Sequence, residues 1–114
     1  MQIILGCKSV YLDLAQDNIV MYQRELPLSR TQIHVMHKLA INIGHPVKTR
    51  DLIQAAWGSK IKINKNSYTK MYVFMHRLRR SIMTKHKEAP VIVTIYGFGY
   101  LLKPCQDNKS LSNR

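Results

Sequence analysis

The sequence predicts an α+β fold in which short strands come first, three helices follow and a β-hairpin closes the chain. Hydrophobic residues stand in short runs up to residue 28, take helical spacing from residue 29 to about residue 84, and return to strand-like runs after residue 90. A length of 114 residues suits one hydrophobic core. We therefore predict a single domain over residues 1–104, followed by a polar and flexible tail at 105–114.

The N-terminal segment, residues 3–28, has the pattern of an antiparallel meander. Breaks at Gly6, 16–18 and 23–25 separate short apolar runs. These runs lie at 3–5, 10–14, 19–22 and 26–28. Because proline has no N–H to donate, Pro27 places the last strand at a sheet edge or at a strand end.

The first helix is predicted to begin after Ser29 and to end at Gly44 and Pro46. Ser29 and Gln32 have the spacing of a capping box, in which each side chain accepts a hydrogen bond from the other residue's backbone N–H. Apolar side chains at helical spacing form its packing face, which comprises Ile33, Met36, Leu39, Ala40 and Ile43.

A second, shorter helix is predicted between Thr49, as its N-cap, and Gly58. Its packing side comprises Leu52, Ile53, Ala56 and Trp57. The loop that follows, at 58–66, carries Lys60, Lys62 and Lys65.

The third helix, at about 67–84, is predicted to be amphipathic, with Asn66 or Ser67 as its cap. Its apolar stripe follows helical spacing and consists of Met71, Met75, Leu78 and Ile82. At about 100° per residue, the opposite face carries Thr69, Lys70, Val73, His76, Arg77, Arg80 and Thr84. Positive and short polar side chains therefore occupy the face that the core does not use.

A β-hairpin at 92–103 is predicted to end the domain. Residues 91–96 and 100–103 are strand-like, and Gly97-Phe98-Gly99 between them suits a turn. A helix with a basic outer face beside such a hairpin is a shape suited to the major groove of DNA.

The charge of the chain points to a polyanionic partner. Eighteen Lys and Arg against six Asp and Glu give a formal net charge of +12 and a pI of about 10.1. Such a charge would also suit a ribosomal or membrane-surface protein, or serve solubility alone. Nucleic acid is favoured because much of the charge is organised on one helix face.

The two cysteines indicate neither a zinc ribbon nor a disulfide framework. Cys7 and Cys105 lie near opposite ends of the chain and form no CxxC pair, so we expect two structural thiols in a reducing compartment. The N-terminus lacks the pattern of a signal peptide, and no stretch has the length of a membrane span. We expect a soluble cytoplasmic protein.

Catalytic, metal and cofactor sites are not expected. His34 and His37 share a helix face, but no carboxylate or cysteine accompanies them at ligand spacing. The six acidic residues supply no set of nucleophile, base and orienting group. Neither a glycine-rich phosphate loop nor a cofactor-binding motif is present.

Four ordered motifs resemble those of the OmpR/PhoB-type winged-helix effector domain. Residues 28–33 resemble its "LTxxEF" segment, and 44–52 with 56–58 resemble "GxVVSREeL…vWG". Residues 74–80 resemble "hIxrLRrK", and 94–100 resemble "TvRGxGY". The resemblance covers roughly residues 10–103. It implies a winged helix-turn-helix with an N-terminal four-stranded antiparallel sheet, a three-helix bundle and a C-terminal β-hairpin wing, without the usual receiver domain.

The resemblance also implies a sequence-specific regulator of transcription that binds double-stranded DNA, with the third helix in the major groove. Arg77 is the expected bidentate partner of guanine, and Val73 could touch a thymine methyl group. The other candidate base-reading residues are Thr69, Lys70 and His76. Candidate phosphate contacts are Lys48, Thr49, Arg50, Arg79, Arg80 and Thr94.

Two positions depart from the family pattern. Tyr72 stands where an acidic residue is usual, and Tyr96 stands where the wing usually carries arginine. The cation that would enter the minor groove is thus replaced by a phenol, which can stack or hydrogen-bond near the sugar-phosphate edge.

Several alternatives stay open at the level of the sequence. Lys60, Lys62 and Lys65 lie where the family contacts RNA polymerase, although a tolerant surface loop explains them equally simply. Pairing on DNA is expected, either head-to-tail or symmetric. Rival functions are a protein-interaction adaptor that grips RNA polymerase or another regulator, and a sequence-neutral binder of nucleic acid.

Overall fold

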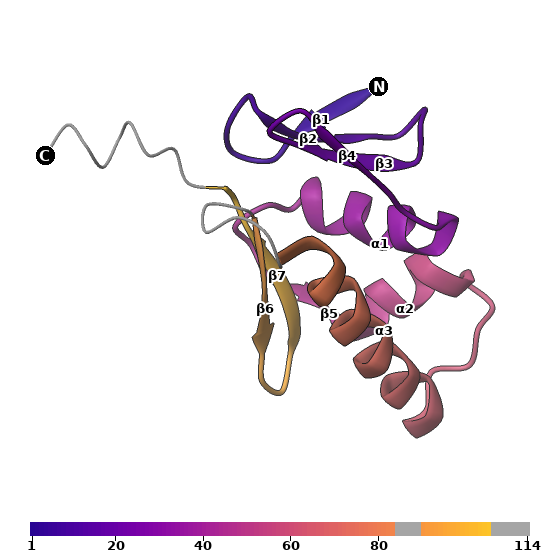
Figure 1. Ribbon diagram of the computed structural model, residues 1–114. Helices are drawn as coiled ribbons and strands as arrows, with labels where there is room; N and C mark the ends of the chain where they lie inside the picture. Colours follow the sequence, from indigo (N-terminus) through magenta and orange to yellow (C-terminus); the bar gives the residue numbers. More distant parts are fainter. Residues whose placement is uncertain (84–89, 106–114) are drawn as a thin grey trace, which may run out of the picture.

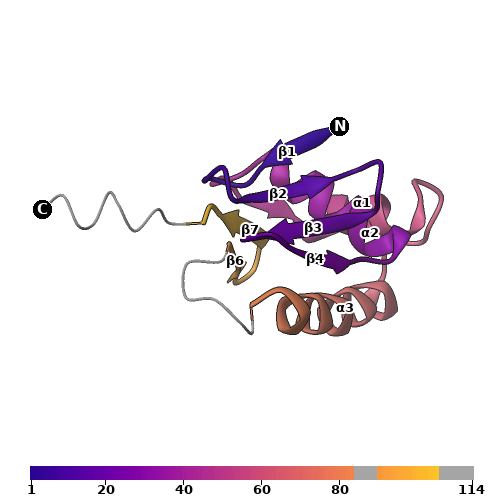
Figure 2. The same cartoon turned by 45° about the horizontal axis from the view of Figure 1, so that its top comes forward.

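The computed structural model describes residues 1–83 and 90–105, without the side chain of Met83. Ten elements are present in this part of the chain, and they fall into two antiparallel sheets and three helices. Figure 1 shows α1 (Arg30–Ala40) between the N-terminal sheet on one side and α2 (Thr49–Trp57) and α3 (Lys65–Met83) on the other. Figure 2 shows the same sheet lying across the front of α1 and α2. The predicted α+β winged helix-turn-helix fold is confirmed.

The N-terminal sheet has four strands in sequence order: β1 (Gln2–Ile4), β2 (Val10–Asp13), β3 (Asn18–Met21) and β4 (Arg24–Pro27). Positive φ angles at Tyr22 and Gln23 make a two-residue turn that matches the twist of the strands it joins. Arg24 and Glu25, which we predicted as part of a break, therefore lie in β4. Pro27 ends this edge strand, as predicted.

The start of α1 is confirmed and its end is corrected. The Gln32 N–H donates to Ser29 Oγ at 3.1 Å, and the Ser29 N–H donates to Gln32 Oε1 at 2.9 Å. The helix ends at Ala40, before the predicted Gly44. A tighter turn follows it and lets the Gly44 N–H donate to the carbonyl of Leu102 at 2.8 Å, so a contact between distant segments overrides the apolar periodicity.

The caps predicted for the other two helices are wrong. Thr49 is the first residue of α2, and its N–H donates to the carbonyl of Phe98 at 3.2 Å. At α3 the capping residue is Asn64, whose Oδ1 accepts from the Ser67 N–H at 3.0 Å, so the helix begins at Lys65. Several potential caps stand close together there, and the structure uses the earliest of them.

The predicted hairpin is part of a three-stranded sheet. Strands β6 (Val91–Ile95) and β7 (Gly99–Lys103) pair as expected, and a short strand that we did not predict, β5 (Val47–Lys48), joins β7 on its other side. Two residues carry no periodicity, so β5 left no signal in the sequence. Its close pairing explains Gly99, where a Cβ atom would overlap the carbonyl of Val47.

The core lies where the helices meet the sheets. The predicted apolar stripe of α3 is fully or almost fully buried at Met71, Met75, Leu78 and Ile82. Val35 of α1 is also buried, although it was not in the predicted face. In the described part of the chain, no helix is both long and apolar enough to cross a membrane.

Cys7 and Cys105 form a disulfide, which corrects the expectation of two separate thiols. The residues lie 98 positions apart, but the return of β7 to the connection between β1 and β2 brings their Cα atoms to 6.0 Å. Cys105 is also buried, so it does not belong to the predicted tail. Residues 106–114 of that tail, and Thr84 of the third helix, lie outside the described residues.

Candidate nucleic-acid interface

The outer face of α3 is exposed, as the helical spacing predicted. Its described members are Thr69, Lys70, Val73, His76, Arg77 and Arg80, and Tyr72 is exposed beside them. No acidic residue occurs in α3. The helix therefore presents cations, short polar groups and one aliphatic side chain, which together can contact base edges and phosphates.

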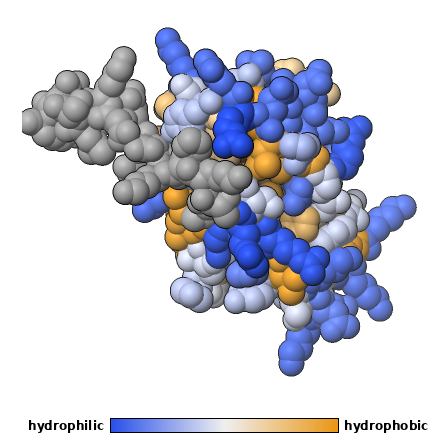
Figure 3. Space-filling model, viewed as in Figure 1, coloured by the Kyte–Doolittle hydropathy of each residue, from blue (hydrophilic) through white to orange (hydrophobic). Residues whose placement is uncertain are grey.

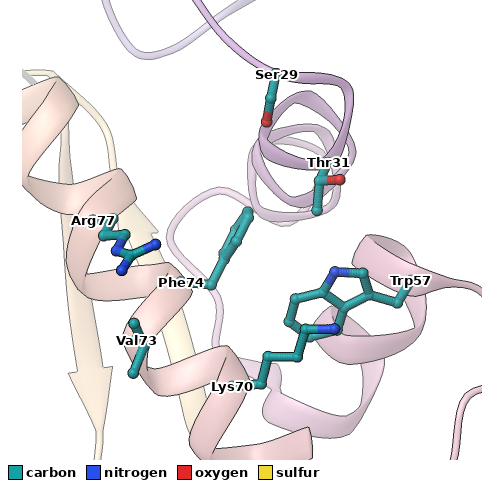
Figure 4. A pocket seen from close by; sticks show the side chains of 7 residues that line it. All are labelled: Ser29, Thr31, Trp57, Lys70, Val73, Phe74 and Arg77. Atoms are coloured by element: carbon teal, nitrogen blue, oxygen red, sulfur yellow. The ribbon is translucent and has the colours of Figure 1, made fainter.

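A groove borders this face where α3 approaches the start of α1 and the end of α2. It encloses about 520 Å³ and is lined by Ser29, Thr31, Trp57, Lys70, Val73, Phe74 and Arg77. Figure 4 shows the side chains of Arg77 and Phe74 pointing from α3 toward the groove, opposite Trp57. Two of the predicted base-reading cations, Lys70 and Arg77, thus lie at its edge.

The wall of the groove is aromatic, a feature that sequence reasoning did not assign to the site. The rings of Trp57 and Phe74 meet edge to face with centroids 5.8 Å apart. The ammonium of Lys70 lies 4.4 Å from the centroid of the Trp57 ring, a cation–π contact worth about 0.5–1 kcal/mol where the pair is exposed. The contact with Trp57 places the Lys70 ammonium on the groove side of α3.

On the opposite flank, α3 is joined to the wing. Arg79 Nη2 donates to Thr94 Oγ1 of β6 at 2.9 Å, and within the described residues the buried Nε of Arg79 has no hydrogen-bond partner. Both residues were predicted to reach phosphate, and the structure brings them together at the edge of the interface. The Thr94 hydroxyl accepts this bond and keeps its own proton for another acceptor.

Tyr100 lies in the same contact region between α3 and the wing. Burial raises the pKa of its phenol, the Arg79 guanidinium acts in the opposite direction, and Tyr72 adds to the rise. The phenol is therefore neutral at physiological pH. Together with Tyr72, His76 and Thr94 it lines a small hollow between α3 and β6.

The start of α2 lies beside the wing because β5 pairs with β7, with Lys48 opposite Gly99. Lys48 and Arg50 are exposed, as a phosphate contact requires, whereas Thr49 is half-buried. The Thr49 hydroxyl lies 3.5 Å from the carbonyl of Phe98, which its N–H also contacts. Of the predicted contacts at this helix end, Lys48 and Arg50 carry the accessible donors.

The tip of the wing is aromatic and uncharged. Tyr96 is 92% exposed and Phe98 is 44% exposed. The Phe98 N–H donates to the carbonyl of Ile95 at 3.0 Å, and Gly97 takes a positive φ of 78°, which closes the turn. Tyr96 therefore projects from a hydrogen-bonded turn.

The connection between α2 and α3 is shorter and more anchored than predicted. Lys65 belongs to α3, while Lys60 and Lys62 are exposed in the connection. Ile61 and Ile63 alternate with these lysines and pack against the core. Figure 3, drawn in the view of Figure 1, shows hydrophilic side chains projecting at the lower right, where this connection and the start of α3 lie.

Charge is distributed unevenly between the two halves of the domain. Among the residues that the structure describes, the acidic ones are Asp13, Asp17, Glu25 and Asp51. Only Asp51 belongs to the helix and wing region, and the others lie in or beside the N-terminal sheet. No three His, Cys, Asp or Glu side chains of the described part come together as a metal site would require. The surface around α3 and the wing is therefore positive.

Comparisons with known proteins agree with this geometry. A family model described as "Transcriptional regulatory protein, C terminal" matches residues 23–102, a stretch that contains all three helices and the wing except its last residue, Lys103. The swarming motility regulation protein RssB of Serratia marcescens is 32% identical over 95 residues, which make up 83% of this chain and 40% of that protein. This chain therefore spans less than half the length of that relative.

Solved structures show the same fold. The DNA-binding domain of RstA from Klebsiella pneumoniae, solved in complex with the RstA box, matches with a TM-score of 0.72 and 20% identity, over 90% of this chain and 97% of that one. The DNA-binding domain of CpxR from E. coli matches with a TM-score of 0.66 and 19% identity, again over 90% and 97% of the two chains.

Proposed function

The chain belongs to the OmpR/PhoB-type family of C-terminal, DNA-binding domains of transcription regulators, and we propose that it reads double-stranded DNA by placing α3 in the major groove and the β6–β7 hairpin beside it as a wing. The observation that carries this proposal is the outer face of α3, which is exposed, basic and free of acidic residues. A groove-entering helix needs such a face.

Base reading is assigned to the outer face of α3. Arg77 is the principal candidate because a guanidinium can donate two hydrogen bonds to guanine O6 and N7. Val73 is 42% exposed and offers a methyl contact to thymine. Thr69, Lys70 and His76 complete the set, with Lys70 approaching from the groove side.

Phosphate contacts are assigned to both sides of that face. Lys48 and Arg50 are exposed at the start of α2, where free backbone N–H groups and the helix dipole also favour an anion. Arg80 extends the basic face of α3. Thr49, Arg79 and Thr94 are secondary candidates because each already has a hydrogen-bond partner within the protein.

The wing is proposed to act through the Tyr96 phenol. The exposed ring can stack on a sugar or donate a hydrogen bond at the edge of the minor groove, but it brings no charge. Its contribution to affinity should therefore depend little on salt.

Pairing on DNA is proposed to be head-to-tail. Three of the four described acidic side chains lie in or beside the N-terminal sheet, whereas Lys60 and Lys62 lie on the α2–α3 connection. A symmetric contact through the lysines of the connection would place like charges together, whereas a head-to-tail contact would bring them to the sheet, which carries Asp13, Asp17 and Glu25 beside Lys8 and Arg24. The lysines of this connection, with Lys65 at the start of α3, also form the proposed surface for RNA polymerase.

The remaining assignments follow from a regulatory role. We propose a cytoplasmic protein that acts at the nucleoid and has no enzymatic activity, cofactor or membrane partner. The experiment described next must distinguish this regulatory function from the two rivals, a protein-interaction adaptor and a sequence-neutral binder of nucleic acid.

The experiment is selection of preferred duplexes from a random DNA pool at moderate salt, repeated with Arg77→Ala and Arg24→Ala. Arg24 is exposed on β4, so its variant loses the same charge away from α3. We expect a short motif, repeated in one direction, that Arg77→Ala loses and Arg24→Ala keeps.

Other outcomes select a rival. Tight, salt-sensitive binding without any enriched motif would identify a sequence-neutral binder. Absence of DNA binding would favour the adaptor. A motif enriched as an inverted repeat would overturn head-to-tail pairing alone.

A further inference from the structure

The disulfide joins two segments that the chain reaches at its beginning and at its end. Cys7 lies in the connection between β1 and β2, and Cys105 follows β7 by two residues. Cys7 is half-buried, whereas Cys105 is only 5% exposed. Cys7 is thus the more accessible of the two residues to a small reagent.

Backbone contacts hold the two segments together independently of the sulfur atoms. The Cys105 N–H donates to the carbonyl of Leu5 at 2.8 Å and so joins the two segments, while the Val10 N–H donates to the carbonyl of Cys7 at 3.1 Å and fixes the connection that carries Cys7. Gly6, with a φ of 108°, lies so close that a Cβ atom there would approach Pro104 Cβ to 2.6 Å. The two thiols of the reduced chain would therefore stay adjacent.

We propose that Cys7 and Cys105 form a reversible thiol–disulfide site, whose oxidant is a low-molecular-weight disulfide of the glutathione class. In a reducing compartment such a pair rests as two thiols. A half-buried thiol that a small reagent reaches, with a resolving thiol beside it, is the arrangement that responds to an oxidant. The site does not depend on whether the chain binds DNA.

The exchange balances in two displacements. The Cys7 thiolate attacks one sulfur of the small disulfide, forms a mixed disulfide and releases one small thiolate. The Cys105 thiolate then attacks Cys7 Sγ and releases the second. Two protein thiols are oxidised, one small disulfide is reduced to two thiols, and the two protons lost by the cysteines go to the released thiolates.

Oxidation clamps the C-terminal end of β7 to the N-terminal sheet. The start of β7 pairs with β5 next to α2, and the turn before it is the wing tip, so the clamp lies at the end of the strand that is farther from the proposed DNA contacts (Figure 1). The link also closes a ring across 98 positions, which restricts the unfolded chain. The expected effect is a change in stability.

The test uses the full chain equilibrated with glutathione and glutathione disulfide over a range of ratios. Alkylation followed by intact-mass measurement counts the free thiols at each ratio, and thermal unfolding is followed on the same samples. We expect both thiols to disappear together within one chain, with a rise in Tm of about 10 °C or more in the oxidised form.

Serine variants provide the controls. Cys105→Ser should keep Cys7 accessible and form a mixed disulfide with glutathione. The variant with both Cys7→Ser and Cys105→Ser should show no dependence of Tm on the ratio. If these variants fail to fold, the reduced wild-type chain serves as the reference state.

Three results would overturn the proposal. One is that both thiols remain free at the most oxidising ratio, and another is that the disulfide forms only between two chains. A bond that survives the most reducing ratio would be a permanent cross-link. None of these readouts involves DNA, so failure here is separate from failure of the proposed function.

Discussion

Arg79 and Thr94 connect α3 to the wing through a single side-chain hydrogen bond at 2.9 Å. Because the donor is charged and the contact is partly buried, Thr94→Val should lower the free energy of unfolding by about 1–2 kcal/mol. Urea denaturation measures this change. Thr69→Val is the matched control, since that hydroxyl only contacts the carbonyl of Lys65 on its own helix. Equal losses in the two variants would show that the Arg79 contact adds nothing.

Tyr100 should make the stability of the domain fall at alkaline pH. Burial raises its pKa from the ordinary value of 10.0, so the folded chain holds the phenolic proton more tightly than the unfolded chain. The resulting stability is fully present below the unfolded pKa and is lost as pH rises through the folded pKa. Tyr100→Phe should therefore flatten the fall in the urea midpoint above about pH 10, whereas Tyr96→Phe, at an exposed phenol, should not. A fall of unchanged steepness in Tyr100→Phe would contradict this.

Some features of the helices and strands could be predicted from the sequence, and others could not. The apolar stripe of α3 and the capping box of α1 were predictable because both are local patterns of spacing. The N-terminus of α2 was wrongly predicted because the Thr49 N–H donates to the carbonyl of Phe98, which lies far along the chain. Strand β5 and the Cys7–Cys105 disulfide could not be predicted for the same reason, because their contacts depend on the path of β7.

Part of the candidate site could likewise be predicted from the sequence, and part could not. The exposure of the outer-face residues of α3 followed from helical geometry. The aromatic wall made by Trp57 and Phe74 did not, because it depends on how closely α2 and α3 approach. The bond between Arg79 and Thr94 likewise joins two elements whose relative placement no local pattern contains.

Pairing of β5 with β7 is the contact between elements that sets the start of α2 beside the wing. At Gly99 an added Cβ atom would meet backbone of Val47 and Thr49, which cannot move aside cheaply. Gly99→Ala should therefore destabilise the fold by roughly 3 kcal/mol or more, a cost in the range of severe packing defects. Gly97→Ala, where space is open but φ is positive, should cost only about 1 kcal/mol. Thermal unfolding of both variants compares these costs, and a mild effect at Gly99 would contradict the observed strand pairing.

At the scale of the whole molecule, the formal charge of +12 implies a strong dependence of DNA affinity on salt. Only cations that reach phosphate contribute to that dependence. Lys48→Ala and Arg50→Ala should each reduce the slope of log affinity against log salt by about one. Tyr96→Ala should weaken binding without changing the slope, because a phenol displaces no counterion. Fluorescence anisotropy with a duplex selected by this chain measures all four proteins.

The control for this prediction is Lys8→Ala, which removes one exposed positive charge from the connection between β1 and β2, beside Cys7 and outside the helices and the wing. Its slope should equal that of the wild type. If Lys8→Ala and Lys48→Ala reduce the slope equally, the salt dependence reflects the net charge of the protein, and the start of α2 makes no specific phosphate contact. If Tyr96→Ala leaves affinity unchanged, the wing tip does not touch the duplex, and sequence reading belongs to α3 alone.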